Sequence, residues 1–179
     1  AEPAQALAAQ INQAGGRALA IGADVSREAD VERLFAQTLD AFGHLDILVA
    51  NSGLQKDAAI SDMTLEEWNA VIGVNLTGQF LCARAALRIF NRQGVRAGVS
   101  RAAGKIIHMS SVHQLIPWAG HVNYAASKGG VEMLMRSLAQ EVSHQRIRIN
   151  GIAPGAIRTA INRAATEGDA EQQLLKLIP

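Results

Sequence analysis

The sequence predicts an α/β fold, a doubly wound parallel sheet of the Rossmann-like kind in a single domain. Helical and strand-like patterns alternate along all 179 residues, as expected when helices connect parallel strands. Polar or turn-forming residues follow the predicted strands at their ends, which is where open parallel sheets bind ligands. Hydrophobic residues make up 49% of the chain, which is ample material for one core.

In the first half, residues 3–14 have a helical pattern that ends at Gly15 and Gly16. Residues 17–25 (RALAIGADV) are expected to form a strand, and Ser26 to cap the next helix. The inner face of that helix is expected to carry Val31, Leu34, Phe35, Leu39 and Phe42. Residues 45–50 (LDILVA) are nearly all apolar, which predicts a short strand buried on both faces.

In the second half, residues 64–91 are predicted to be helical, with a capping box (TLEE) at the start and a bend near Gly73 or Gly78. The glycine-rich residues 94–104 are expected to form an exposed loop. A strand at 105–110, a helix running to about residue 143 and a strand at 146–152 follow. The segment after Pro154 and Gly155 is expected to be helical again.

Tyr124, the only tyrosine, stands four residues before Lys128 and thirteen after Ser111. Residues four apart share one face of a helix. Tyr124 and Lys128 begin a stripe at buried-face spacing that continues through Val131, Met135, Leu138 and Val142. The lysine is therefore expected to lie in line with the core, near the positive end of its helix, where a cation is disfavoured.

This combination suits acid/base chemistry on an alcohol or a carbonyl. A free tyrosine titrates near pH 10, and a neighbouring cation stabilises the phenolate by roughly 1–3 pH units. A phenolate takes a proton from an alcohol, and a phenol gives one to a carbonyl oxygen. The serine would then hold the substrate oxygen by a hydrogen bond.

Other unusual residues fall where predicted strands end, and they predict one crevice onto which the Tyr124 helix opens. They are Asp24, Asn51, Ser52, Gly53, Ser110, Ser111, Pro154 and Gly155. A plain turn-forming role is also open for Asp24, Asn51 and Gly53.

These residues resemble the short-chain dehydrogenase/reductase family over essentially the whole chain. The family's serine and Y-x-x-x-K motif match Ser111, Tyr124 and Lys128, and its helix asparagine matches Asn75 in VNLTG. The resemblance implies that Asn75 supports a proton relay reaching the lysine. A role as a helix-bend residue that bonds backbone is the alternative for Asn75.

The resemblance implies NAD or NADP as cofactor. It implies that Asp24 and Val25 contact adenine and that Asn51-Ser52-Gly53, the counterpart of N-A-G, lines the cofactor pocket. Tyr124 and Lys128 would also touch the cofactor. The P-G-x-[IV]-x-T motif, which lines the nicotinamide in the family, is matched by Pro154, Gly155, Ile157 and Thr159.

Within the family, the motifs MSSVHQLIPW, YAASKGG and GAIRTAIN are most similar to those of bacterial glucose 1-dehydrogenases. Gln55 stands where an acidic residue is expected in those enzymes, which argues against glucose itself. The loop between Ser111 and Tyr124 must pass the site, so four of its residues join Gln55 as candidates for substrate contact, although each also suits a loop or packing role. They are His113, Trp118, His121 and Asn123.

The family's glycine-rich T-G-x-x-x-G-x-G turn, which receives the cofactor pyrophosphate, has no counterpart in the sequence. We expect a partial domain spanning residues 1–179, without the first βα unit and the C-terminal segment. The segment that separates NAD from NADP is missing with it. A non-catalytic binding or assembly module on the same fold therefore stands beside the leading hypothesis, a dehydrogenase acting on a sugar. A 3-oxoacyl-thioester reductase of the same family is a further alternative.

Composition narrows the partners. The net charge is +1, and the basic residues form no stripe, which argues against nucleic acid. No apolar run approaches the ~18 residues of a membrane span, so we expect a cytoplasmic protein. The five histidines lack metal-site spacing, and Cys82 suits a small buried side chain. Small residues on the Tyr124 helix, and the habit of the family, predict a homo-oligomer, a tetramer by resemblance.

Overall fold

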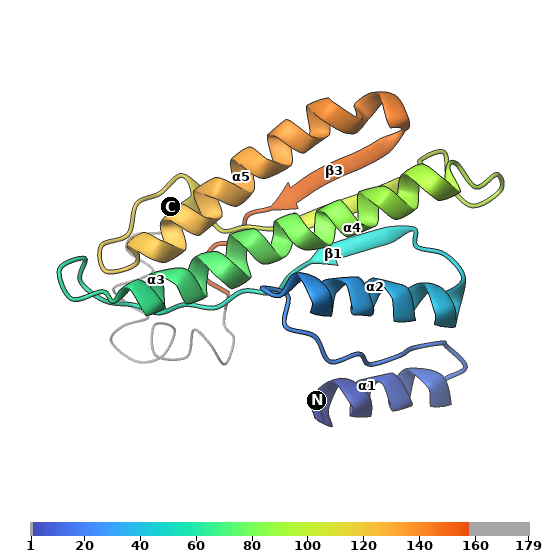
Figure 1. Cartoon of the computed structure of the whole chain (residues 1–179), viewed down its shortest axis with the longest axis horizontal. Coiled ribbons are helices and arrows are strands. Elements are labelled where there is room, and N and C mark those ends of the chain that lie inside the picture. Colours follow the sequence, from blue (N-terminus) through green and yellow to red (C-terminus); the bar gives the residue numbers. More distant parts are fainter. Residues whose placement is uncertain (1, 158–179) are drawn as a thin grey trace.

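The structure is a computed structural model that describes residues 2–157 of the chain. Two helices come first, and helices and strands alternate after them, with two short 3₁₀ turns (η2, η3) and one π-helical segment (η1) between them (Figure 1). The elements are α1 (Glu2–Gln13), α2 (Glu28–Phe42), β1 (Ile47–Ala50), α3 (Leu65–Ile72), η1 (Gly73–Thr77), α4 (Gly78–Gln93), β2 (Gly104–Met109), η2 (Val112–Gln114), α5 (Val122–Val142), η3 (Ser143–Gln145) and β3 (Ile147–Ile152).

The three strands form one parallel sheet in the order β1-β2-β3. Ala50 of β1 pairs with His108 of β2, which pairs with Gly151 of β3, so all three carboxyl ends meet at one edge. This confirms the α/β fold with parallel strands. The helix after Pro154 was predicted over residues that lie largely outside the described range.

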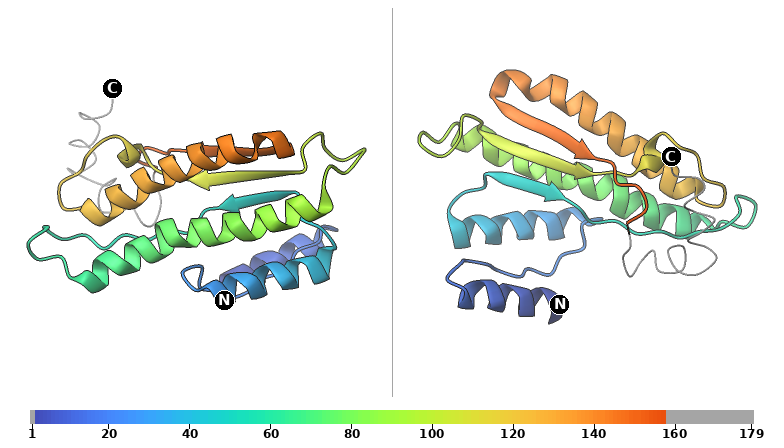
Figure 2. Two further views of the ribbon diagram at one scale, coloured as in Figure 1. Left: turned by 45° about the horizontal axis from the view of Figure 1, so that its top comes forward. Right: turned by 180° about the vertical axis from the view of Figure 1, so that it is seen from behind.

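Within residues 2–157 one face of the sheet is covered by α4 and α5. Helix α4 lies against β1 and β2, and α5 lies against β3. Viewed from behind, the strands stand in front of these helices (Figure 2). The covered face buries Ile106, Ile147 and Ile149, whereas Ile47 and Val49 of β1 are about half exposed on the other face. The prediction that residues 45–50 are buried on both faces is therefore wrong, because composition does not show which layers cover a strand.

The strand predicted at residues 17–25 is also wrong, because no partner strand lies beside this segment in the described structure. Its backbone finds side-chain partners in the neighbouring helices instead. The Ala18 amide donates to Asn12 Oδ1 (2.8 Å), and the Asp24 amide donates to Asp30 Oδ2 (2.9 Å). An extended segment becomes a strand only when another strand pairs with it.

Ser26 does not cap α2, contrary to the prediction. The N-cap position belongs to Arg27, which makes no side-chain cap. The Ser26 hydroxyl instead donates to Asp24 Oδ1 (2.7 Å) and so closes the turn before the helix. Of the predicted inner face, Val31 and Phe35 are buried, and Leu34 and Leu39 pack against the same core.

The long helix 64–93 begins at the predicted capping box. The Glu67 amide donates to Thr64 Oγ1 (3.1 Å), and the Thr64 amide donates to Glu67 Oε2 (2.9 Å). The helix is interrupted near the two predicted glycines, where Gly73–Thr77 widens into a π-helix. Such π segments are rare and frequent at functional sites. This one carries Asn75.

The continuous segment Leu65–Gln93 is, among the described residues, long and apolar enough to cross a membrane. The expectation that no such segment exists is thus wrong on length and composition. Its middle nevertheless carries Asn75 and Gln79, both buried and hydrogen-bonded. Since α4 also packs on β1, β2 and α2, the segment is a core helix of the sheet.

Candidate active site

Three strand ends meet at the edge where the crevice was predicted. Asn51 follows β1, Ser110 and Ser111 follow β2, and Pro154 follows β3. Backbone bonds tie the last two together. The Ser110 amide donates to the Ile152 carbonyl (2.8 Å), and the Val112 amide donates to the Pro154 carbonyl (3.0 Å). The described residues after β3 are thereby held beside those after β2.

Tyr124 and Lys128 occupy the first two turns of α5. The prediction that Lys128 lies on the core stripe is confirmed, since the side chain is only 4% exposed. Its Nζ lies 5.5 Å from the centroid of the Tyr124 ring and donates to the Met109 carbonyl (2.9 Å). Burial disfavours the ammonium form and lowers the pKa of Lys128 to about 8. A cation is therefore held beside the tyrosine at an energetic cost.

Ser111 is 6% exposed and caps η2, where its Oγ accepts a hydrogen bond from the His113 amide (3.2 Å). The 3₁₀ turn packs against α5, and the His113 ring stands edge-on to Tyr124 with 6.4 Å between ring centroids. The serine is thus fixed at the end of β2, on the turn that borders the tyrosine.

Asn75 is fully buried, and its side chain joins three elements. Its Oδ1 accepts from the Leu54 amide (2.8 Å), and its Nδ2 donates to the Leu54 carbonyl (3.0 Å) and to Ser127 Oγ (3.1 Å). A Cβ on Gly53 would lie 3.5 Å from Asn75 Oδ1 and 3.7 Å from Lys128 Nζ. The structure therefore brings Gly53, Asn75 and Lys128 together, and the asparagine bonds the loop after β1 rather than its own helix.

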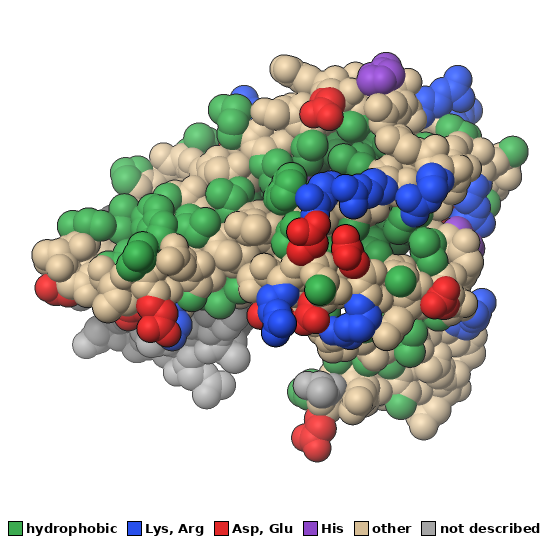
Figure 3. All heavy atoms as spheres, viewed as in Figure 1, with side chains coloured by type: hydrophobic (Ala, Val, Ile, Leu, Met, Phe, Trp, Pro, Cys, Tyr) green, Lys and Arg blue, Asp and Glu red, His purple; other side chains and the backbone are tan. Residues whose placement is uncertain are grey.

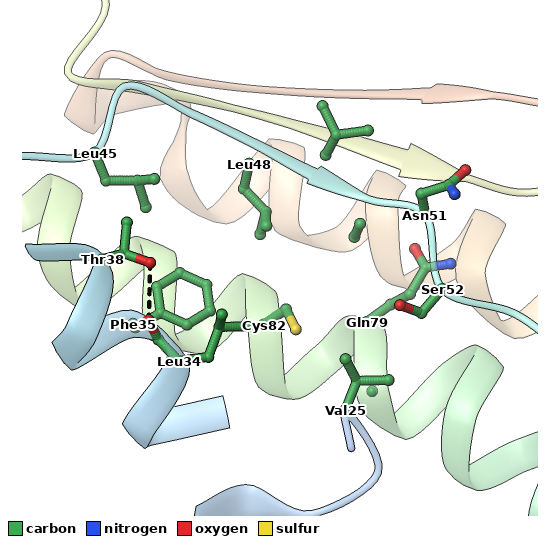
Figure 4. A pocket seen from close by; sticks show the side chains of 13 residues that line it. Val25, Leu34, Phe35, Thr38, Leu45, Leu48, Asn51, Ser52, Gln79 and Cys82 are labelled. Atoms are coloured by element: carbon green, nitrogen blue, oxygen red, sulfur yellow. Dashed lines mark hydrogen bonds between the residues drawn. The ribbon is translucent and has the colours of Figure 1, made fainter. Parts of the chain in front are cut away.

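A cavity of about 200 Å³ lies between α2, β1 and α4 (Figure 4). Val25, Asn51 and Ser52 line its end nearest the strand ends, so the structure brings together three residues predicted to hold the cofactor. The rest of the wall is largely apolar, with Leu34, Phe35 and Leu48. An apolar wall with polar groups at one end fits a flat heterocycle such as adenine.

Asp24 is exposed, and its carboxylate accepts two hydrogen bonds from Ser26, which lower the pKa of Asp24. The turn-forming role is thus seen directly. Gly155 lies near Val112, where an added Cβ would come within 3.9 Å of that side chain, and Ile157 is 56% exposed. Thr159 lies outside the described residues.

The loop between Ser111 and Tyr124 carries a stack of aromatic rings. The ring of Trp118 lies 4.5 Å from that of His113 and 3.5 Å from that of His121, between centroids. His121 Nδ1 lies 2.7 Å from Asp57 Oδ1, which joins the stack to the loop after β1. Asp57 did not stand out in the sequence, because its partner is 64 residues away.

Two further residues were candidates for substrate contact. Asn123 is fully buried, with its amide bonded to the Lys56 carbonyl (2.8 Å) and the Tyr124 amide (2.7 Å), so its contacts are those of a packing residue. Gln55 is partly buried in the loop after β1.

Cys82 is buried, as interpreted from the sequence, and burial raises the pKa of its thiol to about 11. A thiol of this kind is not ionised at neutral pH, so it is no nucleophile. Sequence analysis missed a second buried polar pair, Gln79 and His108. The only available signal was that Gln79 stands one helical turn after Asn75.

Comparisons with known proteins show which family this chain is related to. The family model described as short chain dehydrogenase matches residues 1–170. Glucose 1-dehydrogenase 2 of Bacillus subtilis is 41% identical over 170 residues, covering 94% of this chain and 63% of the relative. 3beta-hydroxysteroid dehydrogenase 1 of Eggerthella lenta is 44% identical over 167 residues, covering 88% and 61%.

Among solved structures, a gluconate 5-dehydrogenase from Burkholderia cenocepacia, in complex with NADP and tartrate, superposes with a TM-score of 0.83 at 32% identity. The match covers 94% of this chain and 63% of that one. The chain thus spans about three-fifths of the length of the relatives it matches. With its fold, its site motif and these matches, the chain belongs to the short-chain dehydrogenase family.

Proposed function

We propose that this chain carries the acid/base site of an NAD(P)-dependent oxidoreductase that interconverts a secondary alcohol and its ketone or lactone. The observation that carries the proposal is the buried Lys128 ammonium, 5.5 Å from the centroid of the Tyr124 ring, at the edge where the parallel strands end. A lysine in the core lowers the stability of the fold. A role in proton transfer at the neighbouring phenol would explain why a lysine stands there.

In this mechanism Tyr124 exchanges a proton with the substrate oxygen. The Lys128 ammonium stabilises the phenolate form, and Ser111 orients the substrate oxygen at the end of β2. Asn75 fastens the loop after β1 close to Lys128 and supports proton transfer there. A bound nicotinamide would supply hydride transfer, with Val25, Asn51 and Ser52 at the cavity as residues that would hold the cofactor.

A sugar such as an aldose is the favoured substrate class. The relatives include a glucose dehydrogenase and a hydroxysteroid dehydrogenase, so sterols are a specific second candidate. A flat surface beside Tyr124 is formed by the stacked rings of His113, Trp118 and His121. His121 is held by Asp57, and a sugar ring or a steroid ring could pack against this surface. We place the protein in the cytoplasm.

A non-catalytic binding module is the alternative from another class. Titration of the complete protein with NAD(H) and NADP(H) separates the two, because a dehydrogenase must bind one of them. An absence of binding by the complete protein would favour the module.

Replacing the phenol tests the catalytic assignment. Tyr124→Phe in the complete protein keeps the ring that contacts Lys128 and His113 but removes the hydroxyl, so kcat is expected to fall at least about 100-fold. Cofactor affinity should change far less. Steady-state kinetics and a fluorescence titration with NAD(P)H measure the two effects. Wild-type turnover in this variant would refute the proposal.

The buried lysine predicts a pH-dependent gain in stability on substitution. The pKa of Lys128 is lowered to about 8 in the folded chain, against 10.5 when exposed. Below pH 8 both states are protonated and the full burial cost applies. Between these two values the unfolded state binds the extra proton, so wild-type stability rises with pH. Lys128→Met should therefore stabilise the protein at pH 7 by up to about 3 kcal/mol.

The advantage of Lys128→Met should shrink as the pH rises above 8, as followed by denaturant unfolding of the cofactor-free protein. The same substitution at Lys56, an exposed residue of the loop after β1, is the control and should show neither effect. A Lys128→Met variant less stable than the wild type at pH 7 would contradict the burial argument.

The substrate class is tested with a panel of purified compounds. We expect the highest kcat/KM with an aldose and NAD(P)⁺, and a lower value with a 3β-hydroxysteroid. Acetoacetyl thioester with NADPH tests the third alternative, a 3-oxoacyl-thioester reductase. A kcat/KM higher with the thioester than with the aldose would make the 3-oxoacyl-thioester reductase the leading hypothesis.

Self-association is expected through the helical face. Hydrophobic side chains gather over α3 to α5 in the view of Figure 3, and Leu65, Phe80 and Met133 are 73%, 42% and 62% exposed. A patch of this kind, spread over α3, α4 and α5, suits a contact with a second copy. Light scattering of the complete protein should give a homo-oligomer, a tetramer by family habit. A monomer at micromolar concentration would exclude this contact.

A further inference from the structure

A chain of buried polar groups runs behind Lys128. Gln79 stands at the start of α4, one turn after Asn75, and is 2% exposed. His108, the last but one residue of β2, is fully buried. Figure 4 shows the amide of Gln79 directed from α4 toward the strand layer. Neither side chain touches the reacting atoms of the proposed mechanism.

The chemistry of these buried groups determines which atom donates and which accepts in each hydrogen bond. Gln79 Nε2 lies 3.0 Å from the Met109 carbonyl, which only accepts, so the nitrogen must donate there. A flipped amide would place two acceptors in contact. Gln79 Oε1 is therefore left to accept, and its 2.7 Å partner, His108 Nδ1, must carry the proton.

The imidazole is thus fixed as the neutral tautomer with hydrogen on Nδ1. Burial lowers the pKa of His108 to about 4, so the ring stays neutral at the pH where such enzymes work. Its Nε2 has no hydrogen-bond partner within residues 2–157. A buried imidazole nitrogen without a hydrogen bond lowers the stability of the fold. In His108 one nitrogen is in this position while the other is bonded to Gln79.

The Met109 carbonyl connects these buried polar groups to the proposed active site. It accepts from Gln79 Nε2 and, at 2.9 Å, from Lys128 Nζ. A carbonyl oxygen has two lone pairs, and here both have a donor. The ammonium on its flexible stem has three N–H groups. Fixing one of them on Met109 leaves the other two with set directions beside Tyr124.

We propose that Gln79 and His108 are positioning residues for Lys128. His108 fixes the amide of Gln79, and that amide and the lysine share the Met109 carbonyl, which holds the ammonium beside Tyr124. The inference rests on the proposed function, because it matters for turnover only if Lys128 acts on Tyr124. Three side chains from α4, β2 and α5 would then act as one unit.

The test compares pH profiles in the complete protein. Gln79→Leu removes both hydrogen bonds of the amide, so the Met109 carbonyl keeps only the lysine as its donor. Without the amide, the carbonyl and the ammonium that it holds can shift together, and the ammonium stabilises the phenolate less. For alcohol oxidation, kcat/KM should then rise with pH at a midpoint about one unit higher than in the wild type. At pH 7 kcat should fall about tenfold with KM nearly unchanged.

Conservative and control variants separate positioning from packing. His108→Asn keeps an N–H donor toward Gln79 Oε1 and should restore most of the wild-type profile, whereas His108→Leu should shift it as Gln79→Leu does. Leu81→Ala, a core truncation on the same helix, should lower stability without moving the midpoint. The Tyr124 ring also lies against His113 of η2, which is unchanged in every variant and contributes equally to each profile.

The Gln79→Leu, Leu81→Ala and Tyr124→Phe variants together distinguish failure of the positioning role from failure of the proposed function. If the Gln79→Leu profile superposes on the wild type while Tyr124→Phe abolishes turnover, the positioning role is wrong and the proposed function stands. An equal shift in Leu81→Ala would also overturn it, since packing alone would explain the effect. If Tyr124→Phe keeps wild-type turnover, the proposed function fails and this inference fails with it.

A measurement on the wild-type protein covers the case in which Gln79→Leu does not fold. The ¹⁵N chemical shifts of the His108 ring distinguish a protonated nitrogen from a bare one. We expect Nδ1 protonated and Nε2 bare, without titration around neutral pH. A ring with hydrogen on Nε2 could not donate to Gln79, and finding one would overturn the proposal.

Discussion

A buried ammonium group needs an acceptor, and in this chain that acceptor is the carbonyl at the end of β2. The Lys128–Met109 bond ties α5 to the central strand at the point where the parallel strands end. Several groups of the candidate site lie close to this bond. Gly53 and Asn75 approach the ammonium from the β1 side, Tyr124 lies one turn before it, and Gln79 shares the carbonyl. The geometry of the site follows from the need to satisfy one desolvated cation.

The residues around this bond are held by the backbone of several elements. Asn75 clasps both backbone groups of Leu54, and the turn after β2 is tied to the chain after β3 through Pro154. Side chains supported in this way keep their positions without a ligand, and such preorganisation is what electrostatic catalysis requires. The stack of His113, Trp118 and His121 is anchored differently, through side-chain contacts of its two histidines. His121 contacts an exposed carboxylate, Asp57, and His113 Nδ1 lies 2.9 Å from the Ile116 carbonyl.

Local patterns in the sequence predicted the elements that depend on local forces. The stripe through Tyr124 and Lys128 correctly predicted a buried lysine, and TLEE correctly predicted where the long helix begins. The errors arose where structure depends on distant partners. Residues 17–25 have strand composition but no strand beside them, and Val49 has core composition on a face left open within the described residues. The contacts of Asp57 with His121 and of Gln79 with His108 join residues 64 and 29 positions apart, which no periodicity reveals.

The π-helical segment Gly73–Thr77 determines how the two halves of the long helix are rotated relative to each other about the helix axis. A π turn accommodates one residue more than an α turn, and each residue advances an α-helix by about 100°. Helix α3 packs on α5, whereas α4 packs on the sheet, so the two halves need different rotational settings. Loss of a single residue between Gly73 and Thr77 would let the helix run on as a regular α-helix, and the widened turn that carries Asn75 would be lost. The site therefore depends on the number of residues in this segment as well as on the identity of Asn75.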